Sequence, residues 1–240
     1  CADIKKAVES ADIIINCAAY TNVDLAESQS ELAYKINADA VASLSETVRE
    51  NNKYLIHIST DFVFDGRGCE PYSETDVPNP INVYGKSKLA GERAFIDSGC
   101  DGCIVRVQWT YGQAGNNFVK KLIERAVSTK TLKVVDDQFG SPTATAEVAK
   151  VLLRIVEQKP RGLFHLAADG FVSRYQMAEF IFDHLKMDVS LSACKTADFN
   201  SPADRPLNSR FNCDKIKSLL GIKIPVWQDQ LTDFLTKVKL

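Results

Sequence analysis

Short apolar runs of strand length alternate along this chain with longer stretches of helical periodicity. The runs at 12–18 (DIIINCA) and 54–59 (YLIHIS) are typical of strands that are buried on both faces. Residues 27–51 between them repeat apolar side chains at helical spacing. Because strands joined by such long crossovers pair in parallel, the alternation predicts a doubly wound α/β fold with a parallel sheet covered by helices.

The alternation continues toward the C-terminus and then weakens. Further strands are predicted at 103–109, 132–135 and 162–167, and further helices at 84–96, 116–128, 143–157, 173–185, 214–220 and 227–238. Five uneven strands argue against a TIM barrel, which needs eight units in about 250 residues. We expect a truncated dinucleotide-binding domain over 1–145, a return of 146–170 to its sheet, and a small substrate-binding lobe mainly over 171–240.

Composition and charge exclude several classes of protein. The 240 residues include 29 Lys+Arg and 31 Asp+Glu, a formal net charge of −2, which argues against a nucleic-acid partner or a polybasic membrane surface. No apolar run approaches the roughly 18 residues that span a bilayer, and the first residues do not resemble a signal peptide. Seven scattered cysteines do not form a secreted disulfide framework, so a cytoplasmic location is expected. The oligomeric state stays open, with a homodimer as one alternative.

Metal and redox motifs are weak in this chain. Cys100 and Cys103 have the spacing of a redox or zinc pair, but no second pair follows, so a turn leading into a strand is favoured. His57 and His165 each lie within an apolar run, which favours core positions over metal ligation. A histidine-based metal site is therefore not expected, and any need for a divalent metal is left open.

Candidate catalytic side chains follow the second predicted strand, where ligands bind in open α/β sheets. Thr60 comes at the end of that strand, and Tyr84 and Lys88 lie four residues apart on one face of the next predicted helix. An ammonium near a phenol favours the phenolate and lowers its pKa from about 10, which makes Tyr84 a candidate general acid–base. With a hydroxyl from Thr60 on the same carbonyl oxygen, the set suits the reversible reduction of a ketone.

Motifs spread over nearly the whole chain carry a resemblance to a known family. They are NCAAYTNVD at 16–24, ISTDFVFDG at 58–66, NVYGKSKLAGE at 82–92, RVQWTYG at 106–112, DQFGSPT at 137–143 and LGIKIP at 220–225. In this order they resemble the dTDP-4-dehydrorhamnose reductases, which are extended short-chain dehydrogenases/reductases with a Rossmann-like fold. The resemblance implies reduction of the C4 ketone of dTDP-4-dehydro-L-rhamnose by NADPH or NADH, which gives dTDP-L-rhamnose for cell-surface polysaccharides.

The resemblance also implies roles for single residues. Tyr84 would protonate the C4 oxygen, Lys88 would lower the tyrosine pKa and bind the nicotinamide ribose, and Thr60 would orient the carbonyl. Asn37 would tie a helix to the sheet beneath the cofactor; the alternative is a local structural role unrelated to the cofactor. The positions that match cofactor contacts are Ala18, Ala19, Tyr20, Thr21, Tyr84 and Lys88, and those expected to bind substrate are Thr60, Asp61, Phe62, Trp109 and Arg205.

Each of the substrate contacts has a plain structural alternative. Phe62 and Trp109 could offer an apolar face to the sugar or base, or could pack in the core. Asp61 could instead cap a local turn. Arg205 could bind the diphosphate through two parallel hydrogen bonds or form a surface ion pair.

One part of the family pattern is missing from this sequence. The family begins with a strand, a glycine-rich turn and a helix that holds the cofactor pyrophosphate, and neither Gly66-x-Gly68 nor Gly112-x-x-Gly115 supplies that motif. The residue that selects NAD over NADP is missing too. We therefore expect that Cys1 is not a native start and that the N-terminal βαβ portion is absent, which would weaken cofactor binding and leave a strand edge unpaired.

Two other functions remain open on the same fold, because fold alone does not decide function. One is a non-catalytic regulatory role like that of the methionine adenosyltransferase β subunit. The other is a reductase or epimerase for a different nucleotide sugar, since sugar choice depends on a few pocket contacts. The intact set of Thr60, Tyr84, Lys88 and Trp109 favours an enzyme.

Overall fold

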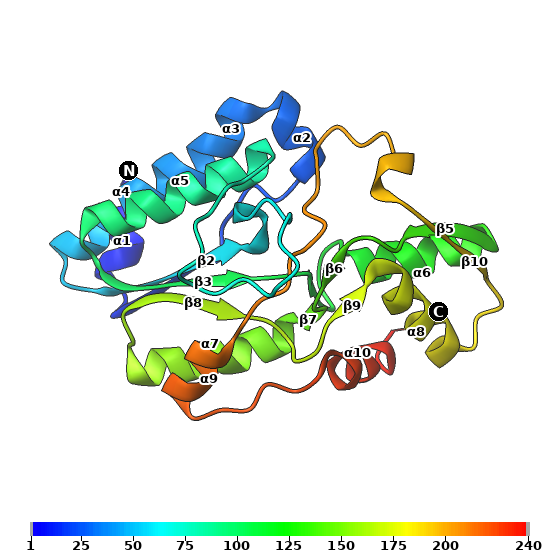
Figure 1. Ribbon diagram of the computed structural model, residues 1–240. Helices are drawn as coiled ribbons and strands as arrows, with labels where there is room; N and C mark the ends of the chain where they lie inside the picture. Colours follow the sequence, from blue (N-terminus) through cyan, green and yellow to red (C-terminus); the bar gives the residue numbers. More distant parts are fainter. Residues whose placement is uncertain (1, 239–240) are drawn as a thin grey trace.

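A four-stranded parallel sheet lies at the centre of the protein, in a computed structural model that describes residues 2–238 (Figure 1). Its strands are β1 (Ile13–Asn16), β2 (Tyr54–Thr60), β3 (Asp101–Val107) and β8 (Gly162–Leu166), in the order β1-β2-β3-β8. Every neighbouring pair is parallel. The predicted α/β fold with a parallel sheet is thus confirmed, whereas the prediction about Cys1 lies outside the described residues.

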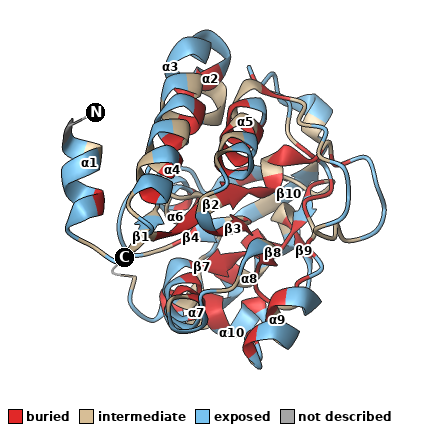
Figure 2. Ribbon diagram, turned by 90° about the vertical axis from the view of Figure 1, so that its left-hand side faces the viewer, coloured by how far each residue is buried: buried red, intermediate tan, exposed pale blue. Residues whose placement is uncertain are grey.

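Helices cover both faces of this sheet (Figures 1 and 2). On one face, Leu55 and Ile104 pack in a core with α1 (Ala2–Glu9), α4 (Ala40–Glu50) and α5 (Val83–Ser98). On the other face, Ile56 and Val105 pack against α7 (Thr145–Gln158) and α9 (Asp214–Leu220). Successive side chains of a strand point to opposite faces, so burial of both faces explains the unbroken apolar runs in the sequence.

The segment between β1 and β2 differs from the single helix predicted over 27–51. It forms α2 (Val23–Ser28), α3 (Ser30–Tyr34), a π-helical turn at Lys35–Asp39 and then α4. The chain leaves helical geometry at Gln29, and the π turn buries Asn37 completely. A single π turn adds only one residue to an otherwise α-helical run, so the apolar stripes of the helices around it do not reveal it.

A second hydrophobic core lies beyond the carboxyl edge of the sheet (Figure 1). It contains α6 (Phe118–Ser128), α8 (Arg174–Leu185) and α10 (Trp227–Leu235), together with β5 (Thr131–Val135) and β10 (Ser190–Cys194). The predicted strand at 132–135 therefore forms, but it pairs in parallel with β10 and not with the central sheet. Its partner β10, SLSAC, escapes prediction because the segment is short and its only large apolar side chain is Leu191.

Short elements connect the two cores. β4 (Thr110–Tyr111) pairs with β7 (Thr143–Ala144), and β6 (Phe139–Gly140) pairs with β9 (Val172–Ser173). Residues 195–210, here called the strap, run from β10 back toward α9 and include a 3₁₀ turn at Thr196–Asp198 (Figure 1). Residues 211–224 pack in the first core, while 118–135 pack in the second. The domain limits near 145 and 170 stay a prediction.

Two features of the described residues concern location and redox state. Between residues 2 and 238, no helix is both long and apolar enough to cross a membrane. The six described cysteines are all free thiols. Cys100 directly follows the glycine that ends α5, and Cys103 is buried in β3, which is the turn-to-strand arrangement favoured from the sequence.

Candidate active site

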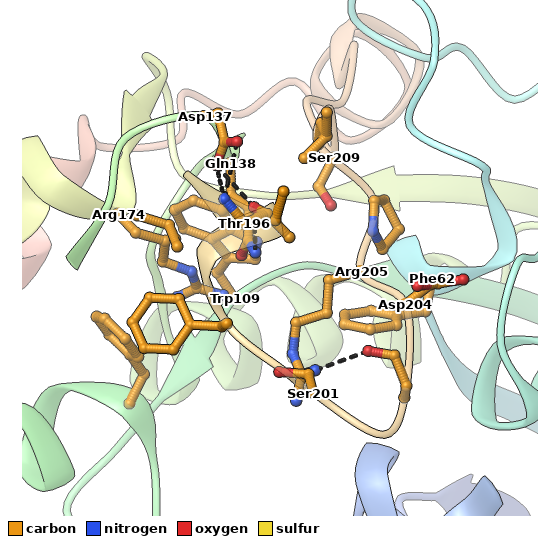
Figure 3. A pocket seen from close by; sticks show the side chains of 17 residues that line it. Phe62, Trp109, Asp137, Gln138, Arg174, Thr196, Ser201, Asp204, Arg205 and Ser209 are labelled. Atoms are coloured by element: carbon orange, nitrogen blue, oxygen red, sulfur yellow. Dashed lines mark hydrogen bonds between the residues drawn. The ribbon is translucent and has the colours of Figure 1, made fainter. Parts of the chain in front are cut away.

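Two cavities meet at the carboxyl edge of the sheet. The inner cavity, of about 540 Å³, lies between the ends of β2 and β3, the first turns of α5, and α7. The outer cavity, of about 590 Å³, lies between the second core and the strap (Figure 3). Three side chains line both cavities, namely Phe62, Trp109 and Arg174.

The predicted residues Thr60, Tyr84 and Lys88 all line the inner cavity. Thr60 is the last residue of β2, and Asn82 caps α5 by accepting a hydrogen bond from the Gly85 N–H, which starts the helix just before Tyr84. Close packing sets the depth of that first turn, because a Cβ on Gly85 would lie 2.1 Å from the Phe62 carbonyl oxygen.

The tyrosine does not have the lowered pKa that the sequence suggested. Burial raises the pKa of Tyr84 to about 12, while the Thr60 hydroxyl lowers it and the charge of Asp61 raises it. The expectation of a lowered pKa is wrong for this structure, in which burial has the largest effect and the Lys88 Nζ donates to the Ile58 carbonyl oxygen at 2.7 Å. The phenol therefore keeps its proton at neutral pH, which is the form that a proton donor requires.

Lys88 is a buried cation at the floor of the inner cavity, with a side chain that is almost fully covered. Burial lowers its pKa to about 8, and the charge of Glu92 raises it. Glu92 lies one helical turn further along α5 and is held by Arg106, at 2.8 Å and 2.6 Å, and by the Ser59 hydroxyl at 2.5 Å. This buried network fixes α5 on the sheet directly below the candidate catalytic residues.

The turn after β1 carries the predicted cofactor contacts. Ala19 and Thr21 line the inner cavity, whereas Ala18 and Tyr20 belong to the same turn but not to the lining. Asn37 holds the turn in place: it accepts from the Tyr20 N–H at 2.8 Å and donates to the Tyr20 carbonyl oxygen at 3.1 Å. Its amide also donates to the Ser87 hydroxyl at 2.9 Å, so Asn37 ties the turn to α5.

Asp61 is a buried carboxyl that lines the inner cavity. Its Oδ1 accepts from the Thr60 hydroxyl at 3.0 Å, whereas its Oδ2 has no hydrogen-bond partner within residues 2–238. Burial raises its pKa. The turn cap that was the alternative role for Asp61 is made by Thr60, whose hydroxyl accepts from the Phe62 N–H at 3.2 Å.

The rings of Phe62 and Trp109 form the boundary between the cavities. The Phe62 ring packs edge-on against Tyr84, with 5.5 Å between the ring centroids. Trp109 has a left-handed backbone with φ of 43°, which is uncommon for a residue with a side chain. A Cβ on Gly140 would lie 2.6 Å from the Trp109 ring, so only glycine fits beneath it.

The last predicted substrate contact, Arg205, lies in the strap and lines the outer cavity. Its Nη2 pairs with Asp24 Oδ2 at 2.8 Å, and its Nη1 donates to the Ala203 carbonyl oxygen at 2.9 Å. The ion pair that was the alternative role is therefore present. Arg205 holds the strap against the start of α2, and this bond lowers the pKa of Asp24.

Two polar residues of the site are not apparent from the sequence. Arg174 is the first residue of α8 after the Ser173 cap, so its sequence context indicates only a helix start. Gln108, buried beside Trp109, accepts from the Ser141 N–H at 3.0 Å and donates to the Ser209 carbonyl oxygen. For Gln108, the one signal available in the sequence is a polar residue within a predicted apolar strand.

The fold and the site together define the class of the protein. A parallel sheet with a Thr at one strand end and a Tyr-x-x-x-Lys pair on the following helix is the arrangement of the short-chain dehydrogenases/reductases. The family model described as the RmlD substrate binding domain matches residues 2–240. The chain belongs to the dTDP-4-dehydrorhamnose reductase family.

Individual relatives support this assignment. The chain is 38% identical over 238 residues to a dTDP-4-dehydrorhamnose reductase of Salmonella typhimurium, covering 95% of this chain and 80% of that protein. A reductase structure of the same name from Clostridium acetobutylicum superposes with a TM-score of 0.93 at 38% identity, covering 97% and 84% of the two chains. One from Bacillus anthracis, in complex with NADP, has a TM-score of 0.94 at 35% identity, with coverage of 99% and 85%.

Proposed function

We propose that the protein reduces the C4 ketone of dTDP-4-dehydro-L-rhamnose, with NADPH or NADH, to give dTDP-L-rhamnose. The observation that carries the proposal is the presence of Thr60, Tyr84 and Lys88 in one cavity, with the tyrosine kept protonated by burial. The names of the relatives support the same reaction, and the NADP complex of the Bacillus anthracis protein supports the cofactor. Free thiols suit a reducing compartment, so we place the reaction in the cytoplasm.

The inner cavity fits a nicotinamide ribose, judged by the donors and small side chains of its lining. Lys88 has three N–H donors and uses one on Ile58, which leaves two for ribose hydroxyls. Ala19 adds only a methyl group to the wall, so a ring can approach the backbone there. A bound reduced nicotinamide supplies the hydride of the reaction.

The protein's own groups handle the proton and hold the ketone. Tyr84 donates its proton to the C4 oxygen, and the charge of Lys88 stabilises the phenolate that remains. Thr60 donates to the same oxygen once its hydroxyl turns away from Asp61, which it bonds in this structure. The free Oδ2 of Asp61 then accepts from a sugar hydroxyl, and Phe62 and Trp109 cover the apolar face of the ring.

The reaction is tested by mixing the protein with dTDP-4-dehydro-L-rhamnose and either NADPH or NADH, and following the absorbance of the reduced nicotinamide. Tyr84→Phe should lower kcat by about 100-fold or more, with little change in substrate binding, because it removes only the transferred proton. Tyr34→Phe, on α3, is the matched control and should be as fast as the unmodified protein.

Two results would contradict the proposal. Absence of turnover with both cofactors would favour the regulatory alternative, and faster turnover of a different nucleotide sugar would favour the other enzyme. If Tyr84→Phe reduced the ketone at the unmodified rate, the proton donor would have to be another group.

A further inference from the structure

Arg174 lies where the two cavities meet and is held between aromatic rings (Figure 3). Its Cζ is 3.4 Å from the centroid of the Trp109 ring and 4.6 Å from that of Phe118. Rings on two sides remove water from a guanidinium but leave its in-plane N–H donors without acceptors. The side chain is therefore positioned with its hydrogen-bonding capacity unused.

Arg174 forms no ion pair with the described residues, which distinguishes it from the other arginines near the site. Burial lowers its pKa, and the more distant charge of Asp61 raises it. Within residues 2–238 its guanidinium has neither a hydrogen bond nor a carboxylate oxygen within 4.0 Å, whereas Arg106 binds Glu92 and Arg205 binds Asp24. A partly buried cation is normally paired, since an unpaired one has lost its hydration without compensation. The site is thus complementary to an anion that is brought by a ligand.

The neighbouring carboxylates do not already fill this role. Asp137, on the wall of the outer cavity, accepts from the Thr196 N–H at 2.9 Å and from its hydroxyl at 2.7 Å. Asp61 is buried in the inner cavity and bonds Thr60; its charge acts on Arg174, but only from beyond 4.0 Å. Asp204 also lines the outer cavity and forms no ion pair with Arg174. The other cation of the outer cavity, Arg205, is paired with Asp24, and its charge lowers the pKa of Arg174.

Position along the ligand then identifies the anion. In the proposed function, the sugar ketone lies in the inner cavity beside Tyr84. The nicotinamide ribose occupies that cavity too, which leaves the adjoining outer cavity for the nucleoside. The group that joins sugar to nucleoside is the diphosphate, so a side chain that lines both cavities meets it. Resting on the proposed function, we propose that Arg174 binds the diphosphate of the nucleotide sugar, held in place by the Trp109 and Phe118 rings.

The planar fork of Arg174 can donate two parallel hydrogen bonds to phosphate oxygens, and the stacked rings fix its orientation beforehand. The competing role for Arg174 is packing alone, in which it supports Trp109 without touching the ligand. The two roles differ in one measurable respect, since only direct binding distinguishes a ligand with a diphosphate from one without it.

The test compares the dissociation constants of dTDP and thymidine, measured by calorimetry, for the unmodified protein, Arg174→Gln and Arg174→Lys. Arg174→Gln should weaken dTDP binding by about 10- to 100-fold and change thymidine binding less than about twofold. Arg174→Lys should recover part of the dTDP affinity, because it keeps the charge but not the fork. Arg125→Gln, an exposed arginine of α6, is the matched control and should bind both ligands normally.

Three results would overturn the inference: unchanged dTDP binding by Arg174→Gln, equal losses for dTDP and thymidine, or an unmodified protein that binds dTDP no more tightly than thymidine. The reductase assignment is judged separately. Turnover by the unmodified protein with an unchanged KM in Arg174→Gln would remove the Arg174 role and leave the reductase. Selective loss of dTDP binding in Arg174→Gln, together with no turnover by the unmodified protein, would keep the Arg174 role and remove the reductase assignment.

Discussion

At the scale of single residues, burial controls the ionisable side chains of the inner cavity. It raises the pKa of Tyr84 to about 12 and lowers that of Lys88 to about 8, so at neutral pH the phenol is protonated and the ammonium is still charged. Ketone reduction needs these two protonation states, because the phenol of Tyr84 gives up a proton and the ammonium of Lys88 stabilises the phenolate that forms.

The rate of reduction should therefore fall as the pH rises through about 8. Above that pH Lys88 loses its proton, and the phenolate left on Tyr84 loses its stabilising charge. The measurement is kcat with saturating substrates from about pH 6 to about pH 10. A rate that stays constant across this range would show that the charge of Lys88 does not assist the reaction.

The position of the Trp109 ring depends on the absence of a side chain at Gly140. In Gly140→Ala the new methyl group would lie 2.6 Å from the ring, which Arg174 already covers, so the ring must shift. We expect KM for the nucleotide sugar to rise severalfold and the free energy of unfolding to fall by about 1–3 kcal/mol.

Steady-state kinetics and urea unfolding measure these two effects. Gly68→Ala is the control, because its nearest neighbour would be the Tyr72 hydroxyl at 3.8 Å, an ordinary contact. An unchanged KM in Gly140→Ala would mean that the ring position does not affect substrate binding.

At the scale of elements, α5 places the candidate catalytic residues at a fixed depth through contact with the π turn. A Cβ on Gly91 would lie 2.0 Å from the Asn37 carbonyl oxygen, which is backbone and does not move easily. Gly91→Ala should therefore push α5 away, lower the free energy of unfolding by about 1–3 kcal/mol or more, and reduce kcat through Tyr84. Lys86→Ala, exposed on the same helix, should change neither quantity appreciably. Full activity and stability of Gly91→Ala would contradict this view of the contact.

The elements also show what sequence patterns contain and what they omit. β2 is predictable because both of its faces are buried, and α8 because Ser173 caps its first turn. β10 and the π turn are not, since one depends on a distant partner strand and the other on burial of a single polar residue. The same holds for the site. The positions of Thr60 and Tyr84 can be predicted from the strand and helix around them, whereas the position of Arg174 depends on how α8 packs in the second core.

At the scale of the whole molecule, two buried histidines link stability to pH. His57 in β2 and His165 in β8 are both fully buried, and burial lowers the pKa of His57 well below its usual value and that of His165 to about 3. His165 contacts the Tyr72 carbonyl oxygen and Arg106, so the folded protein holds it uncharged next to a permanent cation. The folded state therefore excludes protons that the unfolded chain accepts.

The sign of the effect follows from this difference. In the unfolded chain histidine binds a proton below about pH 6.5, whereas His165 in the folded protein does so only near pH 3, so stability is lost as the pH falls through this interval. At about pH 5 each such histidine should reduce the free energy of unfolding by about 2 kcal/mol relative to about pH 7.5. Urea unfolding of His165→Gln should show that much less dependence on pH, while the exposed His184→Gln should behave as the unmodified protein does. Equal pH dependence in His165→Gln and the unmodified protein would mean that His165 is not what makes the folded state sensitive to acid.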